Sequence, residues 1–144
     1  MSERPTRPAF VPRGEERLFY DRLREHELVF QRCTSCARVV FPLRTVCPGC
    51  GSETALTVER AEGGGVVHSW TTQHRAPHPH FATPLTLALA DLDEGFRVLA
   101  AVPEPTDLAV GARVRVGFDD VDPDLTLLRL DVVTGRTDPE EARG

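Results

Sequence analysis

Four cysteines, arranged as two CxxC pairs, constrain this chain more than any other feature. Cys33 and Cys36 form the first pair, and Cys47 and Cys50 form the second, ten residues further along. A two-residue gap lets both sulfurs of a pair face one ion, and two such pairs complete the tetrahedron of a structural zinc at metal–sulfur distances of about 2.3 Å. The second pair encloses a Pro-Gly dipeptide and precedes Gly51, which suits a tight turn. We therefore predict a Zn²⁺ ion bound by these four cysteines.

Two other kinds of cysteine site remain as alternatives. Rubredoxin-type iron takes the same four ligands, and thioredoxin-like redox chemistry uses one CxxC pair, which would leave the second pair unexplained. In the zinc site every ligand position is filled by protein, so the ion has no position for water or substrate and is not expected to be catalytic. The chain has four cysteines. None is left over as a nucleophile.

The segment before the first cysteine pair predicts an arm and a helix. Residues 1–14 are rich in proline and poor in apolar side chains, which indicates a flexible arm. Over 15–28, Leu18, Phe19 and Leu23 recur on one helix face, so this stretch predicts a short amphipathic helix. Such a helix either caps its own domain or docks on another subunit.

Strand patterns dominate the rest of the chain. Short apolar runs over 28–30 and 39–41 flank the first cysteine pair and predict two short strands. Five further strands are expected at residues 66–74, 85–91, 96–102, 112–118 and 125–133. Five strands at short spacing suit a small closed barrel of the OB type. The chain therefore predicts a mainly β fold with an N-terminal helix, in which a zinc ribbon is followed by a five-stranded OB-fold barrel.

A length of 144 residues suits one domain or one domain with a small appendage. The expected division is a flexible arm over 1–14, an N-terminal helix with a lead-in strand over 15–30, a zinc ribbon over 31–61, an OB-fold barrel over 62–134 and a disordered tail over 135–144. The Gly-Gly-Gly run at 63–65 has no following Lys-Ser or Lys-Thr and leads into a strand, so it is a hinge rather than a phosphate loop.

One proline-rich loop is a candidate contact site. Arg75, His78, His80 and Phe81 lie in it, and its prolines lower the entropy lost when such a loop is ordered against a ligand or partner. The guanidinium of Arg75 also suits a phosphate. A plain solvent loop and a second metal site at the histidines are the alternatives.

Acidic residues crowd another segment, at Asp119, Asp120, Asp122 and Asp124. Their spacing lacks the glycine and the closing glutamate of a calcium loop, so we expect a solvated turn. Serine residues lack the context of a nucleophile elbow. The sequence assembles no nucleophile, base and oxyanion donor, so no catalytic residue is assigned.

Charge and hydropathy narrow the class of partner. The net charge is −5, and residues 61–144 carry seven arginines against fourteen acidic side chains. This acidic half disfavours nucleic acid as a partner. The sequence lacks an apolar run of the roughly 18 residues that span a bilayer and the apolar core of a signal peptide, so we expect a cytoplasmic protein without membrane contact.

Four stretches of the sequence occur in an order more specific than either cysteine pair alone. They read FYDRLREHELVFQRC, CTSCARVVFPLRTVCPGCGS, GGGVVHSWTTQHRAPHP and LALADLDEGFRVLAAV. In this order they resemble the zinc-ribbon/OB-fold acyl-CoA-associated family of small bacterial and archaeal proteins. The resemblance covers residues 16–133, about four-fifths of the chain. It implies a rubredoxin-like zinc ribbon, with the four cysteines matching the family's metal ligands one for one.

The resemblance also implies a partner and a function. Family members act as non-catalytic subunits, or domains fused behind a hydratase, beside thiolase-superfamily proteins that make or break C–C bonds of CoA thioesters. These reactions include thiolysis and the retro-aldol cleavage of steroid side chains. By this resemblance, the chain is expected to join a heteromer built around a thiolase-like dimer and to be an accessory subunit of a lyase or acyltransferase complex, without catalysing the reaction alone.

Two parts of the chain would then contact the partner or an acyl-CoA ligand. The ribbon and the helix, with Phe19 and Tyr20, would dock on the partner, while the barrel and its proline-rich loop would help to shape the acyl-CoA channel. Two other functions remain open. One is a self-sufficient acyl-CoA-binding or thioesterase-like protein, and the other is a nucleic-acid-binding OB/zinc-ribbon protein.

Overall fold

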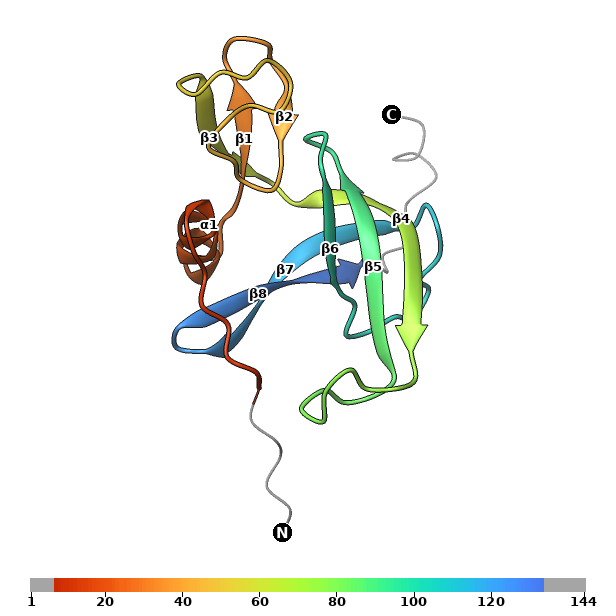
Figure 1. Cartoon of the computed structure of the whole chain (residues 1–144). Helices are drawn as coiled ribbons and strands as arrows, with labels where there is room; N and C mark the ends of the chain where they lie inside the picture. The colour runs from red at the N-terminus through yellow and green to blue at the C-terminus, as the bar shows by residue number, and fades with distance from the viewer. Residues whose placement is uncertain (1–6, 134–144) are drawn as a thin grey trace.

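The computed structural model describes residues 7–133, so the start of the expected arm and the expected tail over 135–144 lie outside the described residues. Within them the chain forms one helix, a three-stranded sheet and a closed five-stranded barrel (Figure 1). The predicted mainly β fold, with an N-terminal helix, a four-cysteine ribbon and a barrel, is confirmed. Among these residues no helix has the length and apolar character needed to cross a membrane.

The helix α1 (Glu15–Arg24) ends four residues before its expected boundary. Its first turn carries Glu15 and Glu16 and its last turn carries Arg22 and Arg24, which complements the helix dipole. Leu23 is its buried residue and packs toward the rest of the protein. The chain needs the residues after Arg24 to turn into the first strand, which shortens the helix.

The cysteine-containing half forms a small antiparallel sheet in the order β2-β1-β3. Its strands are β1 (Leu28–Cys33), β2 (Val39–Val40) and β3 (Leu56–Ala61). The sequence analysis did not predict β3, whose pattern is interrupted by charged side chains. Pairing with β1 along six residues, from Leu28 opposite Ala61 to Cys33 opposite Leu56, determines that it is a strand. β1 extends to the first cysteine, so that residue lies at the end of a strand.

The barrel consists of β4 (Gly64–Gln73), β5 (Leu85–Leu92), β6 (Arg97–Ala101), β7 (Arg113–Asp122) and β8 (Leu125–Val132). The strands follow the order β4-β5-β6-β8-β7 around the barrel. All neighbours are antiparallel except β6 and β8, which are joined by one parallel register pair, Ala101 with Arg129. The barrel is therefore weakly closed along the seam between β6 and β8.

Two expectations about loops hold only in part. Gly63 lies between the ribbon and the barrel as expected, but it is buried and its carbonyl accepts the Val116 N–H at 2.8 Å, which fixes it to β7. A side chain at Gly65 would press against the Asp91 carbonyl, so this glycine permits the close approach of β4 and β5. The acidic segment is not a solvated turn throughout, since β7 continues to Asp122 and pairs with β8. The turn itself is only the two residues between these strands.

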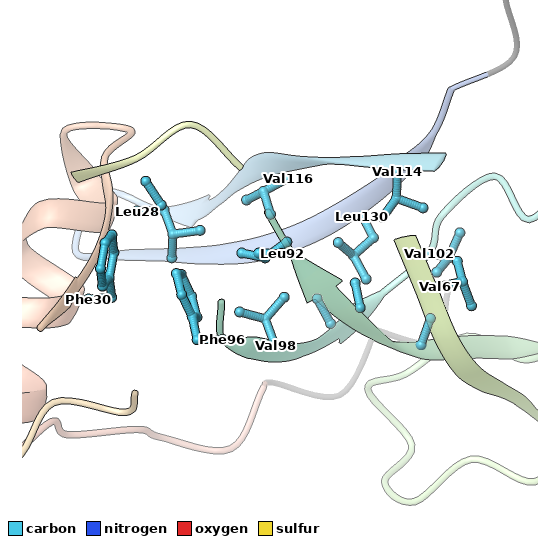
Figure 2. Packing of buried hydrophobic residues seen from close by; sticks show 14 residues of the cluster. Leu28, Phe30, Val67, Leu92, Phe96, Val98, Val102, Val114, Val116 and Leu130 are labelled. Atoms are coloured by element: carbon cyan, nitrogen blue, oxygen red, sulfur yellow. The ribbon is translucent and has the colours of Figure 1, made fainter. Parts of the chain in front are cut away.

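The ribbon and the barrel share one hydrophobic core. Leu28 and Phe30 on β1 are 2% exposed and belong to the same cluster as barrel residues such as Phe96 and Val98 (Figure 2). The rings of Phe30 and Phe96 stack with centroids 5.0 Å apart. Phe41, just after β2, lies 4.8 Å from Phe96. The two halves are thus packed as a single body.

Candidate metal centre and groove

The four cysteine sulfurs meet at the end of the ribbon. Cys33 and Cys50 sulfurs are 3.6 Å apart, Cys36 and Cys47 sulfurs are 3.7 Å apart, and all four lie within 4.8 Å of one another. A tetrahedron with metal–sulfur distances of about 2.3 Å has sulfur–sulfur edges of about 3.8 Å. The cysteines are therefore positioned to bind one metal ion. Cys33 and Cys47 are buried, whereas Cys36 and Cys50 are exposed.

The two cysteine turns have the same backbone construction. In the first, the Ala37 N–H donates to the Cys33 carbonyl at 2.8 Å, and in the second the Gly51 N–H donates to the Cys47 carbonyl at 2.9 Å. Both closing residues have left-handed φ values, 65° for Ala37 and 76° for Gly51. Glycine adopts this conformation at little cost, and alanine does not. The first turn is therefore strained where the second is not.

Backbone N–H groups favour the thiolate form of the two buried cysteines, Cys33 and Cys47. The Gly49 N–H donates to the Cys47 sulfur at 3.4 Å. Hydrogen bonds from the backbone of Cys50 and then of Gly49 lower the pKa of the Cys47 thiol to about 6, against the opposing effect of burial. Since thiolates rather than thiols bind metals, Cys47 is prepared to bind a cation.

A groove of about 690 Å³ lies where α1, the ribbon and the barrel meet. One wall is α1, with Phe19 and Tyr20, and the end wall is the segment after β2, with Phe41 and Leu43. The floor comes from the outer face of β5 and β6 and from β8 across the weak seam, and it includes Leu99. The volume lies within the range of roughly 300–1,000 Å³ that is typical of small-molecule sites.

Polar and charged side chains also line this largely apolar groove, among them Arg7 and Arg129. Arg7 lies with its guanidinium carbon 5.6 Å from the centre of the Phe81 ring, and Arg129 is paired with Asp131 at 3.1 Å. Burial, followed by the nearby Glu16 carboxylate, raises the pKa of Tyr20 above its usual value. The described residues that line the groove include no serine, threonine, cysteine or lysine. Covalent catalysis by such a nucleophile is therefore not available there.

The structure brings together some of the sequence-predicted contact residues. Phe19, Tyr20, His80 and Phe81 all line the groove, and the His80 and Phe81 rings are 5.2 Å apart. Arg75 is exposed and lies outside the groove lining. His78 does not line it either, but its Nδ1 accepts the backbone N–H of His80 at 3.0 Å and so orders the loop.

The four cysteines form the one cluster of possible metal ligands in the described range 7–133, and it contains no histidine. The alternative of a second metal at the histidines has no support there.

The sequence analysis missed the leucines of the groove. On β5, the small residues Ala88 and Ala90 point into the narrow barrel, while Leu87 alternates with them and lines the groove outside. On β6, Leu99 is 62% exposed between the buried Val98 and Ala100. A strand with small residues on one face and leucines on the other was the available signal, because outward leucines need a cover.

Comparison with protein-family profiles identifies both halves of the chain. The rubredoxin-like zinc ribbon domain of ChsH2 matches residues 21–56, and the C-terminal OB-fold domain of ChsH2 matches residues 58–119. The second match ends within β7, although β8 completes the barrel. The ribbon and the OB fold predicted from the sequence are both confirmed.

Individual relatives agree with these profiles. A probable enoyl-CoA hydratase alpha subunit of Thermomonospora curvata is 34% identical over 123 residues, which are 84% of this chain and 38% of that protein. A DUF35 domain-containing scaffold protein of Methanocaldococcus jannaschii is 31% identical over 94 residues, 63% of this chain and 67% of the relative. The chain thus spans well under half of the hydratase subunit and two thirds of the scaffold protein.

A solved structure shows the same arrangement. A chain of the Ltp2-ChsH2(DUF35) aldolase is 31% identical and superposes with a TM-score of 0.76, covering 88% of this chain and 98% of that one. The family profiles, the relatives and the solved structure therefore all identify the same family. The chain belongs to the ChsH2/DUF35 family, in which a rubredoxin-like zinc ribbon precedes an OB-fold domain.

Proposed function

We propose that the chain is a non-catalytic, zinc-containing subunit or domain that supports a thiolase-superfamily partner acting on C–C bonds of acyl-CoA thioesters. The observation that carries this proposal is the apolar groove between α1, the ribbon and the barrel, which has the size of a ligand site but no serine, threonine, cysteine or lysine in its described lining. In this proposal the groove receives part of the acyl or pantetheine chain. The reacting groups then belong to the partner.

The metal centre supports a structural role. Cys33, Cys36, Cys47 and Cys50 would hold a zinc ion, which supplies no open coordination position and therefore stabilises the ribbon rather than activating a substrate. Because the ribbon shares its core with the barrel, a folded ribbon also holds the groove in shape.

The relatives support the kind of partner. One similar chain is part of an aldolase, another is within a probable enoyl-CoA hydratase alpha subunit, and others are scaffold proteins. A scaffold needs a docking surface, and exposed apolar side chains lie on α1, which forms one wall of the groove, and in the groove floor. Leu18 on α1 is 41% exposed and Leu99 on β6 is 62% exposed. Their burial against a partner would remove this apolar area from water.

Coexpression with a thiolase-like protein tests the proposal. The partner is expected to copurify with the chain and to cleave or form C–C bonds of acyl-CoA only in its presence. Leu99→Arg should prevent copurification or activity, because it places a charge at the groove. Val110→Arg is the matched control, since Val110 is 70% exposed but lies outside the groove lining. Full activity of the partner without this chain would sink the proposal.

A self-sufficient acyl-CoA-binding protein is the second candidate, and the size of the groove favours it. The two candidates differ in what the chain does alone. Saturable binding of octanoyl-CoA by the isolated chain, measured by calorimetry and lost in Leu99→Arg, would support the second candidate. A binding signal that appears only after the partner is added would support the first.

A further inference from the structure

The segment between β2 and the second cysteine pair touches both the groove and the metal centre. Phe41 and Leu43 line the groove, and Cys47, a metal ligand by position, follows only four residues after Leu43. Leu43 is 9% exposed, so its side chain is packed rather than loose. The groove wall and a metal ligand therefore lie at the two ends of one short segment, with Arg44 in its middle.

Gln31 on β1 holds that middle. Its side-chain Nε2 donates to the Arg44 carbonyl at 3.0 Å, and the Arg44 N–H donates to its Oε1 at 2.7 Å. Gln31 is only 6% exposed, so these bonds satisfy a buried amide group. Loss of such a pair leaves buried donors and acceptors without partners. The side chain thus substitutes for a strand partner at a place where the segment has none.

The segment has few other attachments. In the part of the chain that the structure describes, residues 42–46 make their hydrogen bonds with Gln31 alone. Phe41 anchors the start of the segment through its ring, 5.6 Å from Phe19 and 4.8 Å from Phe96. The segment is therefore held at three points, which are the aromatic core, the amide of Gln31 and the cysteine site.

We propose that Gln31 is a positioning residue that couples the metal centre to the groove, so that the bound metal sets the position of Leu43 in the groove wall. The proposal rests on the proposed function in treating the groove as a binding site. Gln31 lies on β1 two residues before Cys33, so with its bonds in place a change at the metal centre passes from Cys33 through Gln31 to Arg44 and then to Leu43. Without these bonds Arg44 is no longer tied to β1, and the change does not reach Leu43. Coupling of this kind is reciprocal, so a change at Leu43 also alters how firmly the metal is held.

The first test is the rate at which the zinc-loaded full chain releases its metal to a chromophoric chelator. Gln31→Met keeps the length and burial of the side chain but removes both hydrogen bonds, and we expect release about tenfold faster. Thr57→Val is the matched control, because Thr57 donates one side-chain hydrogen bond within the ribbon, to the Arg32 carbonyl at 3.1 Å, away from this segment. Its release rate should stay within about twofold of the parent.

The second test separates coupling from simple destabilisation. Methyl NMR signals of Leu43 are followed when zinc is exchanged for the larger cadmium ion, with Leu130, fully buried in the barrel, as the reference. We expect the Leu43 signals to shift in the parent and in Thr57→Val, and the shift to shrink at least about twofold in Gln31→Met. A merely structural role for Gln31 would lower stability without changing this response.

Two results would overturn the proposal. One is a Leu43 signal that does not respond to the metal exchange in the parent, and the other is an equal response in the parent and in Gln31→Met. Should Gln31→Met fail to fold, Gln31→Glu replaces it, since it keeps the acceptor for the Arg44 N–H and loses the donor, and an intermediate response is expected. No partner and no acyl-CoA enters these measurements, so their outcome is separate from that of the proposed function.

Discussion

Phe30 of the ribbon and Phe96 of the barrel stack at 5.0 Å with their ring planes 29° apart, and both rings are almost completely buried. Two halves that meet through such a contact cannot unfold independently without exposing aromatic surface. The ribbon and the barrel should therefore unfold together as one cooperative unit.

Phe30→Ala tests this shared core. We expect a loss of about 3–5 kcal/mol in the free energy of unfolding, because a large buried ring is replaced by a cavity. Urea denaturation of the metal-loaded chain, followed by circular dichroism, measures the change. Leu99→Ala, at a residue 62% exposed, should change it by no more than about 0.5 kcal/mol. Two separate transitions in the parent protein would contradict the single unit.

The unequal strain of the two cysteine turns gives a second prediction. Ala37→Gly should stabilise the metal-loaded chain by up to about 1 kcal/mol, because it relieves a left-handed alanine. Gly51→Ala should destabilise it by about 1–2 kcal/mol through backbone strain, since no atom lies within 4 Å of the added methyl position. Thermal denaturation of the two variants measures both effects. Shifts of the same sign at both positions would show that strain does not distinguish the turns.

Metal content is the third prediction. The purified chain should contain about one zinc ion per molecule by elemental analysis, and Cys47→Ser should remove it. Because the ribbon and the barrel share a core, loss of the metal should also lower the unfolding temperature of the barrel. Ser35→Ala, within the first turn but not among the clustered ligands, should keep the metal. A metal-free parent, or iron in place of zinc, would contradict the zinc assignment.

A pH dependence follows from the ion pair between Asp93, in the turn between β5 and β6, and Arg113, at the start of β7. Two hydrogen bonds of 3.1 Å from Arg113, together with its charge, hold the pKa of Asp93 below its usual value. A lowered carboxyl pKa contributes stability that is present above the unfolded-state pKa of about 3.9 and is lost as the pH falls through the folded-state value. Asp93→Asn should therefore lower the unfolding temperature at pH 7 and have no effect at about pH 2.

Exposure limits the size of this effect, because solvent and salt screen the pair. Thermal unfolding of the parent and of Asp93→Asn, measured from pH 2 to pH 7, gives the difference directly. Asp124→Asn serves as the control, since the Asp124 side chain is 94% exposed. A difference between the parent and Asp93→Asn that grows on acidification would contradict the assignment.

The sequence predicted those features that depend on spacing within a short segment. Cysteine pairs two residues apart predicted the metal centre, and alternating side chains predicted the barrel strands, because each pattern is local. β3 was missed because Glu59 and Arg60 interrupt its pattern, and only pairing with β1 makes it a strand. The groove was missed as a whole, since it is assembled from segments as far apart as Phe19 and Leu99.

The sequence also did not predict which of the candidate contact residues would lie at the groove. His80 and Phe81 lie at the groove, while Arg75, five residues before His80, lies outside its lining. Proline content predicted a stiff loop but not which side of it faces the protein. The ring contact between His80 and Phe81 and the hydrogen bond from the His80 N–H to His78 determine that orientation.

The core that joins β1 to the barrel also bears on how such proteins diverge. The two family profiles meet between residues 56 and 58, inside β3, yet the packing of Leu28 and Phe30 on Phe96 crosses that boundary. If the ribbon of one relative were joined to the barrel of another, the side chains at this contact would have evolved beside different neighbours and would pack poorly. We therefore expect residue changes on the two sides of this contact to compensate one another in descent, and the ribbon and the barrel to be inherited as one unit.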